Sequence, residues 1–340
     1  MTGLRKPEVV EIAKGAWQIN ELGLNSMYVI EGTERALVVD AGSGYCNFRE
    51  IIESLTNKPY DVAITHAHPD HIGMCRQFER VFINRKELGR IREPGQADNG
   101  FAPPGMGGPF VDSLPTEPSK RLSELERDGQ MSGMFKHCTA KEYGISDFYL
   151  VYNQHVGYYD TWEISEDMIC RGDYDTELVF IDEGFEFDLG DRKVKTMYLP
   201  GHSPGHLLFI DPGTRIAFTG DCVNHNNGSG IHAASTHIRY IEHFLEEYGK
   251  SYDRIFNGHG SYGGTFHTLS EDIAVVRNLA EAYRDLLRGE ATVEARASHL
   301  FPDGPKREVV IYGKGTKDDP LVTPGKPPRL WEEGEEHIIP

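Results

Sequence analysis

A cluster of three histidines and one aspartate within six residues sets the tightest limit on the fold and chemistry of this chain. Its members are His66, His68, Asp70 and His71. The cluster follows an apolar run at residues 61–65 that predicts a strand, and a helical pattern resumes at residues 72–78. Imidazole and carboxylate groups are the ligands that zinc and its first-row neighbours prefer. Because a loop at a strand end can direct adjacent side chains to different sides, these four residues can serve two metals.

Three more candidate ligands lie downstream, each directly after a glycine at the end of an apolar run. They are His202, Asp221 and His259. Glycine permits the sharp turns and close backbone approach that such strand ends need. Asp40 closes the run at residues 36–40, where an aspartate commonly forms a turn. Each residue is a weak signal alone, but their shared context predicts that strand ends supply further metal ligands.

Short apolar runs alternating with amphipathic segments predict a layered α/β fold. Strands are expected at residues 16–20, 27–31, 36–40, 61–65, 178–181, 186–189, 194–199, 207–210, 215–219, 254–257 and 308–312. Helices are expected at residues 46–54, 238–248 and 268–289, the last beginning at a capping-box pattern formed by Thr268 and Glu271. With 340 residues, the chain has room for one large domain with insertions or for two domains.

The character of the sequence changes between residues 94 and 175, which we interpret as an insertion. Residues 99–110 are too rich in glycine and proline for a helix or a central strand, and the later part is dense in aromatic residues. The insertion is interpreted either as a lid over a bulky apolar or aromatic substrate or as a dimerisation arm. Residues 290–340 form a C-terminal extension, rich in proline and glycine around one strand candidate.

Composition excludes several classes of function. The chain carries 35 Lys and Arg against 53 Asp and Glu, a formal net charge of -18, which disfavours nucleic acid and anionic membranes as partners. No apolar run is long enough for a signal peptide or a membrane span. The cysteines are scattered without a paired spacing, which favours reduced thiols. We therefore expect a cytoplasmic protein that acts on a small molecule, and a homodimer if the insertion is an arm.

The ordered set His-x-His-x-Asp-His, then His, Asp and His, resembles the metallo-β-lactamase superfamily over roughly residues 16–260, and in particular its glyoxalase II-type thioesterases and lactonases. The resemblance implies an α/β fold of the αββα four-layer sandwich type, here as one domain over residues 1–340. It also implies a pair of metal ions. One would be held by His66, His68 and His202, the second by Asp70, His71 and His259, with Asp221 bridging both. Asp40 and His206 would support these ligands without binding metal themselves.

Departures from the superfamily's branches narrow the function that the resemblance implies. Asp221 occupies the motif position where some zinc β-lactamases carry a cysteine ligand, and we interpret Cys222 beside it as a buried thiol, so antibiotic hydrolysis is not expected. Asn224 stands where the lactonase branch typically has a tyrosine. The C-terminal region shows no Lys and Arg cluster of the kind with which glyoxalase II holds glutathione, and we do not expect the flavodoxin-like domain of the di-iron flavoproteins. What remains is a generic dinuclear hydrolase with an unusual insertion.

We therefore predict a metal-dependent hydrolase in which a hydroxide bridging two divalent cations attacks an ester, lactone or thioester of a small apolar or aromatic acyl compound. Zinc is the expected metal, with iron or manganese as alternatives. Asp70 is expected to orient the hydroxide and to take up its proton. Amide or β-lactam bonds and phosphodiesters are the next hydrolytic candidates, and a mononuclear iron oxygenase on the same fold is the alternative chemistry. A silent binding protein is disfavoured because the ligand set is intact.

Overall fold

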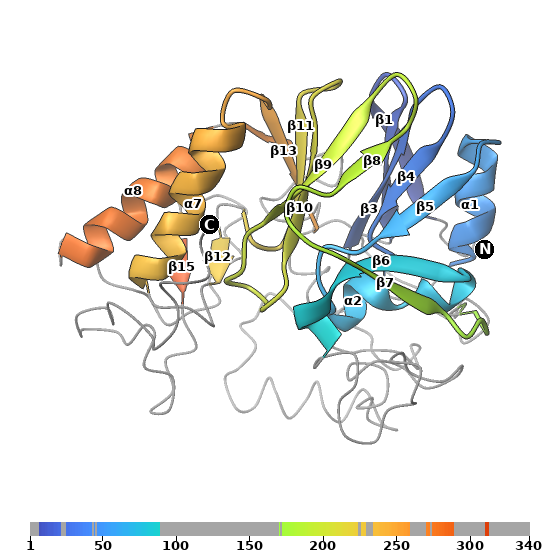
Figure 1. Cartoon of the computed structure of the whole chain (residues 1–340), viewed down its shortest axis with the longest axis horizontal. Coiled ribbons are helices and arrows are strands. Elements are labelled where there is room, and N and C mark those ends of the chain that lie inside the picture. The colour runs from blue at the N-terminus through green and yellow to red at the C-terminus, as the bar shows by residue number, and fades with distance from the viewer. Residues whose placement is uncertain are drawn as a thin grey trace, which may run out of the picture.

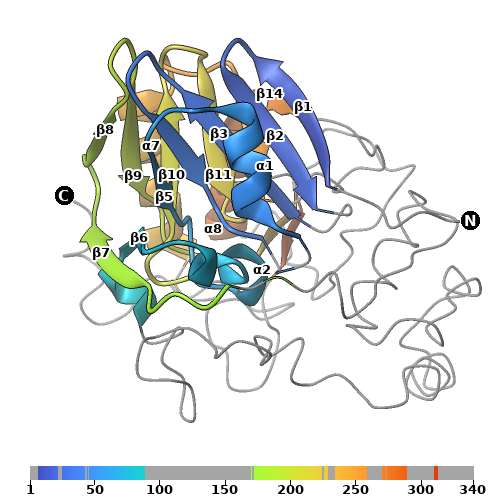
Figure 2. The ribbon, with the colours of Figure 1, turned by 90° about the vertical axis from the view of Figure 1, so that its right-hand side faces the viewer.

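Two β-sheets lie face to face in the computed structural model, with helices on their outer sides (Figure 1, Figure 2). The structure describes residues 7–21, 25–42, 44, 46–88, 170, 172–223, 226–228, 234–258, 270–272, 274–288 and 310–312. Within these ranges, no helix has the length and apolar content needed to cross a membrane.

The first sheet has seven strands in the order of the chain. They are β1 (Glu8–Ala13), β2 (Ala16–Glu21), β3 (Asn25–Glu31), β4 (Ala36–Val39), β5 (Tyr60–Ala63), β6 (Arg80–Asn84) and β7 (Glu177–Ile181). β1 to β4 pair antiparallel, whereas β4 to β7 pair parallel. Helix α1 (Phe48–Leu55) covers this sheet (Figure 2). It begins where the side chain of Asn47 accepts a hydrogen bond from the Glu50 amide, which caps the helix.

The second sheet has six strands in the order β14-β13-β11-β10-β9-β8. Their bounds are β8 (Glu186–Asp188), β9 (Lys193–Tyr198), β10 (Leu207–Asp211), β11 (Ile216–Gly220), β13 (Arg254–Asn257) and β14 (Ser270–Asp272). β11 and β13 pair parallel and the other neighbours antiparallel. Helices α7 (Ala234–Tyr248) and α8 (Ala274–Arg288) cover the outer face (Figure 1). β12 (Asn226–Gly228) and β15 (Val310–Tyr312) form a separate parallel pair.

The core divides into two clusters because the central strands are buried on both faces. Tyr28 and Leu37, from β3 and β4, pack in one cluster with residues of the second sheet, α7 and α8. Their strand neighbours Val29 and Val38 pack in the other cluster, with Phe48 of α1. Burial on both faces explains why these strands are continuous apolar runs and do not alternate with polar residues. The layers follow the order helix, sheet, sheet, helix, which confirms the predicted αββα sandwich.

Two predicted helices differ from those in the structure. The pattern at residues 72–78 forms no continuous helix, because α2 (Pro69–Ile72) ends early and a separate 3-10 turn, η1 (Cys75–Gln77), follows. The helix predicted from Thr268 begins only at Ala274, and Glu271 pairs with Ile255 in the strand pair β13–β14. The capping-box prediction was therefore wrong, since pairing with an open sheet edge outweighs a local helix-start signal.

Most of the predicted insertion and extension lies outside the described residues. Of residues 94–175 the structure describes 170 and 172–175, and of residues 290–340 it describes β15. The chain that leaves the insertion packs closely on η1. The Tyr174 amide donates to the Arg76 carbonyl at 3.0 Å, and a Cβ at Gly172 would lie 2.1 Å from the same oxygen. The lid and arm interpretations, and the single-domain division, stay predictions.

Candidate metal centre

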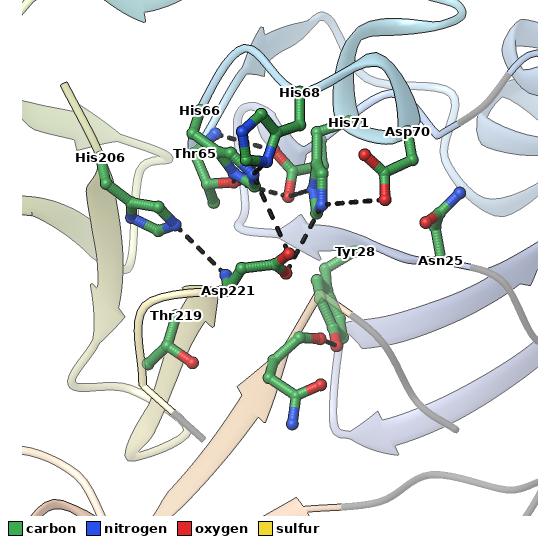
Figure 3. Close-up of polar contacts among 12 residues, drawn as sticks. Asn25, Tyr28, Thr65, His66, His68, Asp70, His71, His206, Thr219 and Asp221 are labelled. Atoms are coloured by element: carbon green, nitrogen blue, oxygen red, sulfur yellow. Dashed lines mark hydrogen bonds and ion pairs between the residues drawn. The ribbon is translucent and has the colours of Figure 1, made fainter. Parts of the chain in front are cut away.

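Four strand ends supply the side chains of the site and a fifth supplies backbone, where strands of the two sheets approach each other (Figure 3). Asp40 follows β4, residues 65–71 follow β5, His202 follows β9, Asp221 follows β11 and Gly258 follows β13. β4 is parallel to β5, and β11 is parallel to β13, so the carboxyl ends within each pair meet at one edge of their sheet. The Gly258 amide donates to the Gly220 carbonyl at 2.9 Å and ties two of these ends together.

The first group of donor atoms consists of three imidazoles and one carboxylate. His66, His68, His202 and Asp221 present one ligand atom each, and these atoms all lie within 4.8 Å of one another. Nδ1 of His68 lies 2.9 Å from Nε2 of His66 and 2.8 Å from Nε2 of His202. Oδ2 of Asp221 lies 3.4 Å from Nε2 of His202. This set fits a transition-metal site by ligand type and by convergence, and we name it the first donor group.

Asp70 and His71 form a second donor group, which lies on the other side of the Asp221 carboxylate. Oδ1 of Asp221 lies 3.5 Å from Nε2 of His71, and Oδ2 of Asp70 lies 3.8 Å from the same nitrogen. Asp221 therefore turns one carboxylate oxygen to each group (Figure 3). His259, the remaining predicted ligand, lies outside the described residues.

Burial and neighbouring charge set the protonation of these histidines. Burial lowers the pKa of His66 well below its usual value, and the adjacent His71 and His68 rings lower it further. Burial and the His68 ring also lower the pKa of His202, to about 3. Neutral imidazoles keep a lone pair available, as metal ligation requires. Burial lowers the pKa of His71 too, but the carboxylates of Asp221, Asp70 and Asp40 outweigh burial and raise it well above the usual value.

Asp40 holds the metal loop from outside the two donor groups. Its Oδ1 accepts from the Thr65 amide at 2.7 Å, and its Oδ2 lies 2.9 Å from Nδ1 of His71. Nδ1 of His71 is thereby engaged, and its Nε2 faces the second donor group. Asp40 adopts a φ of 64°, a left-handed conformation that costs energy and recurs at functional sites. These contacts match the bracing position predicted for this residue.

His206 supports the first donor group without belonging to it. Its Nε2 accepts from the Asp221 amide at 3.2 Å, and its ring stacks on His66 with centroids 4.8 Å apart. Burial lowers the pKa of His206 well below its usual value, so the ring is neutral and can accept this hydrogen bond. Cys222, next to Asp221, is fully buried, as predicted.

Two residues at the site escaped the sequence analysis. Glu87 accepts a hydrogen bond from the amide of Ala67, which lies between two candidate ligands. Tyr28 donates to the carbonyl of Asn257, the residue before Gly258. Neither position carries a local signal, because Glu87 stands in the charged run Arg-Lys-Glu and Tyr28 in an apolar strand. The one general hint at Glu87 is its place shortly after an apolar run, because an acidic side chain there can reach back to the edge of a sheet.

The metal-free protein is expected to lose stability as the pH falls below 6.5. A histidine of the unfolded chain takes up a proton near pH 6.5, whereas the buried His66 and His206 rings stay neutral in the folded state to much lower pH. The unfolded chain then binds more protons, so each of these residues lowers the free energy of unfolding by about 1.4 kcal/mol per pH unit below 6.5. Urea denaturation of chelator-treated protein across this range measures the effect.

The contribution of His71 to the free energy of unfolding changes in the opposite direction, at pH values above 6.5. Its pKa is raised in the folded state, so its stabilising contribution is complete below 6.5 and is lost as the pH rises through the folded-state value. The metal-free protein should therefore be most stable near pH 6.5. A free energy of unfolding that increases on acidification below that value would contradict the neutral state of the two buried rings.

The sequence is similar to one protein family and to individual known proteins. The family model described as the metallo-beta-lactamase superfamily matches residues 21–266. The human acyl-coenzyme A thioesterase MBLAC2 is 23% identical over 210 residues, which cover 58% of this chain and 58% of that protein. The hydroxyacylglutathione hydrolase of Francisella philomiragia is 30% identical over 83 residues, which cover 23% of this chain and 33% of that protein. The chain thus spans less than two thirds of these relatives.

A solved structure shares the architecture at low identity. The stereoselective inverting sec-alkylsulfatase Pisa1 from Pseudomonas sp. superposes with a TM-score of 0.50 at 14% identity, covering 90% of this chain and 48% of that protein. At this identity the likeness extends to the fold alone.

Proposed function

The chain belongs to the metallo-beta-lactamase superfamily, and on this premise we propose that it is a dinuclear, metal-dependent hydrolase of ester, lactone or thioester bonds. His66, His68 and His202 would hold one ion and Asp70, His71 and His259 the other, with Asp221 shared. Zinc suits this mixture of imidazole and carboxylate, and iron or manganese are the alternatives.

The two-sided placement of Asp221 carries the proposal. Its Oδ2 lies 3.4 Å from Nε2 of His202 and its Oδ1 lies 3.5 Å from Nε2 of His71. A carboxylate that served a single ion would not need both oxygens turned to separate imidazole groups. The backbone of Asp221 is held by His206 at 3.2 Å, so the carboxylate is anchored at this position.

The chain's own residues supply orientation and proton transfer. When bound, divalent ions lower the pKa of water towards neutrality and polarise the scissile carbonyl. Asp70 is almost fully buried, and its Oδ2 lies 3.8 Å from Nε2 of His71 within the second donor group. We assign its carboxylate the role of orienting the attacking water and accepting the proton that this water releases. The leaving group of a thioester, lactone or activated ester departs without a dedicated acid.

Thioesters rank first among these bonds. Two curated relatives are named as an acyl-coenzyme A thioesterase and a hydroxyacylglutathione hydrolase, and both names describe thioester substrates. The net charge of -18 disfavours a polyanionic carrier such as coenzyme A, and it favours a small apolar or aromatic acyl group on a less charged thiol. The carrier is therefore the variable that the experiment resolves.

A hydrolysis panel with zinc-loaded protein tests the proposal. One aromatic acyl group is presented as a neutral pantetheine-type thioester, a glutathione thioester, a coenzyme A thioester and an aryl ester, beside an aromatic lactone, a β-lactam and a phosphodiester. Thioester turnover is expected to be the fastest, and Asp70→Ala is expected to abolish it while the circular dichroism spectrum persists. Asp188→Ala changes an exposed aspartate away from the site and serves as the matched control.

Different outcomes of the panel point to different chemistry. Turnover of Asp70→Ala close to that of the parent would contradict the role of Asp70. Preference for the β-lactam or the phosphodiester would overturn the bond class but not the metal site. One iron per chain together with oxygen consumption would overturn hydrolysis in favour of an oxygenase.

A further inference from the structure

Glu87 is a fully buried carboxylate that contacts both histidine-bearing loops of the first donor group. Its Oε2 accepts from the Ala67 amide at 2.8 Å, and its Oε1 accepts from the Ser203 hydroxyl at 2.7 Å and from the Gly205 amide. Ala67 lies between His66 and His68, and Ser203 directly follows His202. One side chain therefore joins the loop after β5, from the first sheet, to the loop after β9, from the second.

The backbone that carries Glu87 is itself held in place. Glu87 ends the 3-10 turn η2 (Arg85–Glu87), which Asn84 caps by accepting from the Lys86 amide at 2.9 Å. The Asn84 amide group also donates to the Ile181 carbonyl of β7 at 3.2 Å. Because both neighbouring strands fix this turn, Glu87 forms a rigid support on which the two loops rest.

The loops leave little room for another arrangement. A Cβ at Gly205 would lie 2.9 Å from Cγ of Glu87 and 3.0 Å from Oδ1 of Asn84. Lys86 donates from Nζ to the Tyr198 hydroxyl at 2.8 Å, and that hydroxyl donates to the Pro204 carbonyl at 2.7 Å. The 202–206 loop is thus held against η2 on two sides, with the Glu87 carboxylate at the contact.

The distance between the two loops determines whether the first donor group converges. Nδ1 of His68 and Nε2 of His202 come from different loops and lie 2.8 Å apart. A metal site tolerates displacements of only about 0.5 Å before its ligands lose their geometry. We propose that Glu87 is a positioning residue that sets the spacing of His68 and His202, and through it the metal affinity of the first donor group. This role rests on the proposed function, because it takes these histidines as ligands.

The second donor group depends on a different support. Asp40 contacts His71 and Thr65, and Glu87 contacts neither Asp70 nor His71 among the interactions of the described residues. Glu87 therefore supports the first donor group alone, and a change at Glu87 should act on that group.

Glu87→Gln tests the role with little change in size. An amide replaces one acceptor oxygen by a donor, which then faces an amide hydrogen of Ala67 or the donors at Ser203 and Gly205. Competition with a chromophoric chelator is expected to show metal affinity lowered about 10- to 100-fold. In a His71→Ala background the full loss should persist, whereas in a His202→Ala background Glu87→Gln should add little. The cobalt-loaded variant should also show a changed visible absorption spectrum.

Asp211→Asn is the matched control. Asp211, the last residue of β10, is an equally buried carboxylate that accepts from the Gly213 amide at 2.9 Å and the Thr214 hydroxyl at 2.6 Å and also pairs with Arg192. It is expected to lower the unfolding midpoint with metal affinity unchanged. Should Glu87→Gln not fold, Ser203→Ala removes one contact of the carboxylate and is expected to lower metal affinity a few-fold, as about one hydrogen bond allows.

Two negative results have different meanings. Wild-type metal affinity in folded Glu87→Gln or Ser203→Ala, with only the unfolding midpoint lowered, would overturn the positioning role and leave the proposed function intact. A wild-type protein that binds no divalent metal would overturn the proposed function and the positioning role together.

Discussion

Replacing Asp221 with alanine is expected to empty both donor groups at once. Because Asp221 presents one oxygen to His202 and the other to His71, its loss removes a ligand from each side. Bound metal should fall well below one ion per chain, and kcat/KM on the best thioester should fall at least about 1,000-fold, since several kcal/mol of transition-state stabilisation disappear. Elemental analysis after gel filtration and initial-rate kinetics measure the two effects.

Asp221→Asn makes this prediction specific to a shared carboxylate. The amide keeps a single oxygen, so it can serve one donor group but not both. We expect this variant to retain about one ion per chain and to lose most of its activity. The fold should persist in both variants, because the backbone amide of Asp221 bonds to His206 and does not depend on the carboxylate. An alanine variant that retains two ions would contradict the bridging position.

The sequence predicted the parts of the site in which chemistry and local pattern coincide. His66, His68 and His71 follow an apolar strand within a few residues, so their proximity needs no knowledge of the fold. His202 and Asp221 are distant in sequence but share the pattern of a glycine after a strand, and the structure brings them together. Their roles as ligands, like that of His259, stay predictions that the Asp221 variants test.

Contacts that depend on tertiary packing could not be predicted. Glu87 lies in a charged run, which from sequence alone indicates a solvated turn, yet two loops from different sheets enclose it. β14 carries a helix-start pattern and forms a strand because the edge of β13 is open to it. In both cases the contact partner lies outside the local segment, so local periodicity and capping patterns do not reveal it.

Gly258 leaves the space in which the two donor groups meet. A Cβ at this position would lie 2.5 Å from Oδ1 of Asp221 and 2.5 Å from Cε1 of His71. The backbone cannot retreat easily, because the Gly258 amide donates to the Gly220 carbonyl and its own carbonyl accepts from the Ser26 amide at 2.8 Å. A methyl group there must displace the Asp221 carboxylate or the His71 ring, since tightly packed interiors yield little.

Gly258→Ala is therefore expected to disable the site while every donor residue remains. Metal affinity should fall by about 100-fold or more, beyond what loss of an outer support usually costs, because two donor side chains move. Gly184→Ala is the control: a Cβ at Gly184 meets nothing within 4 Å, and the φ of 78° makes the backbone the only source of strain. That variant should lose about 1 to 2 kcal/mol of stability with metal affinity unchanged. Wild-type metal affinity in Gly258→Ala would mean that Asp221 and His71 do not bind metal in the arrangement described, because no ligand geometry that uses both leaves room for the added methyl group.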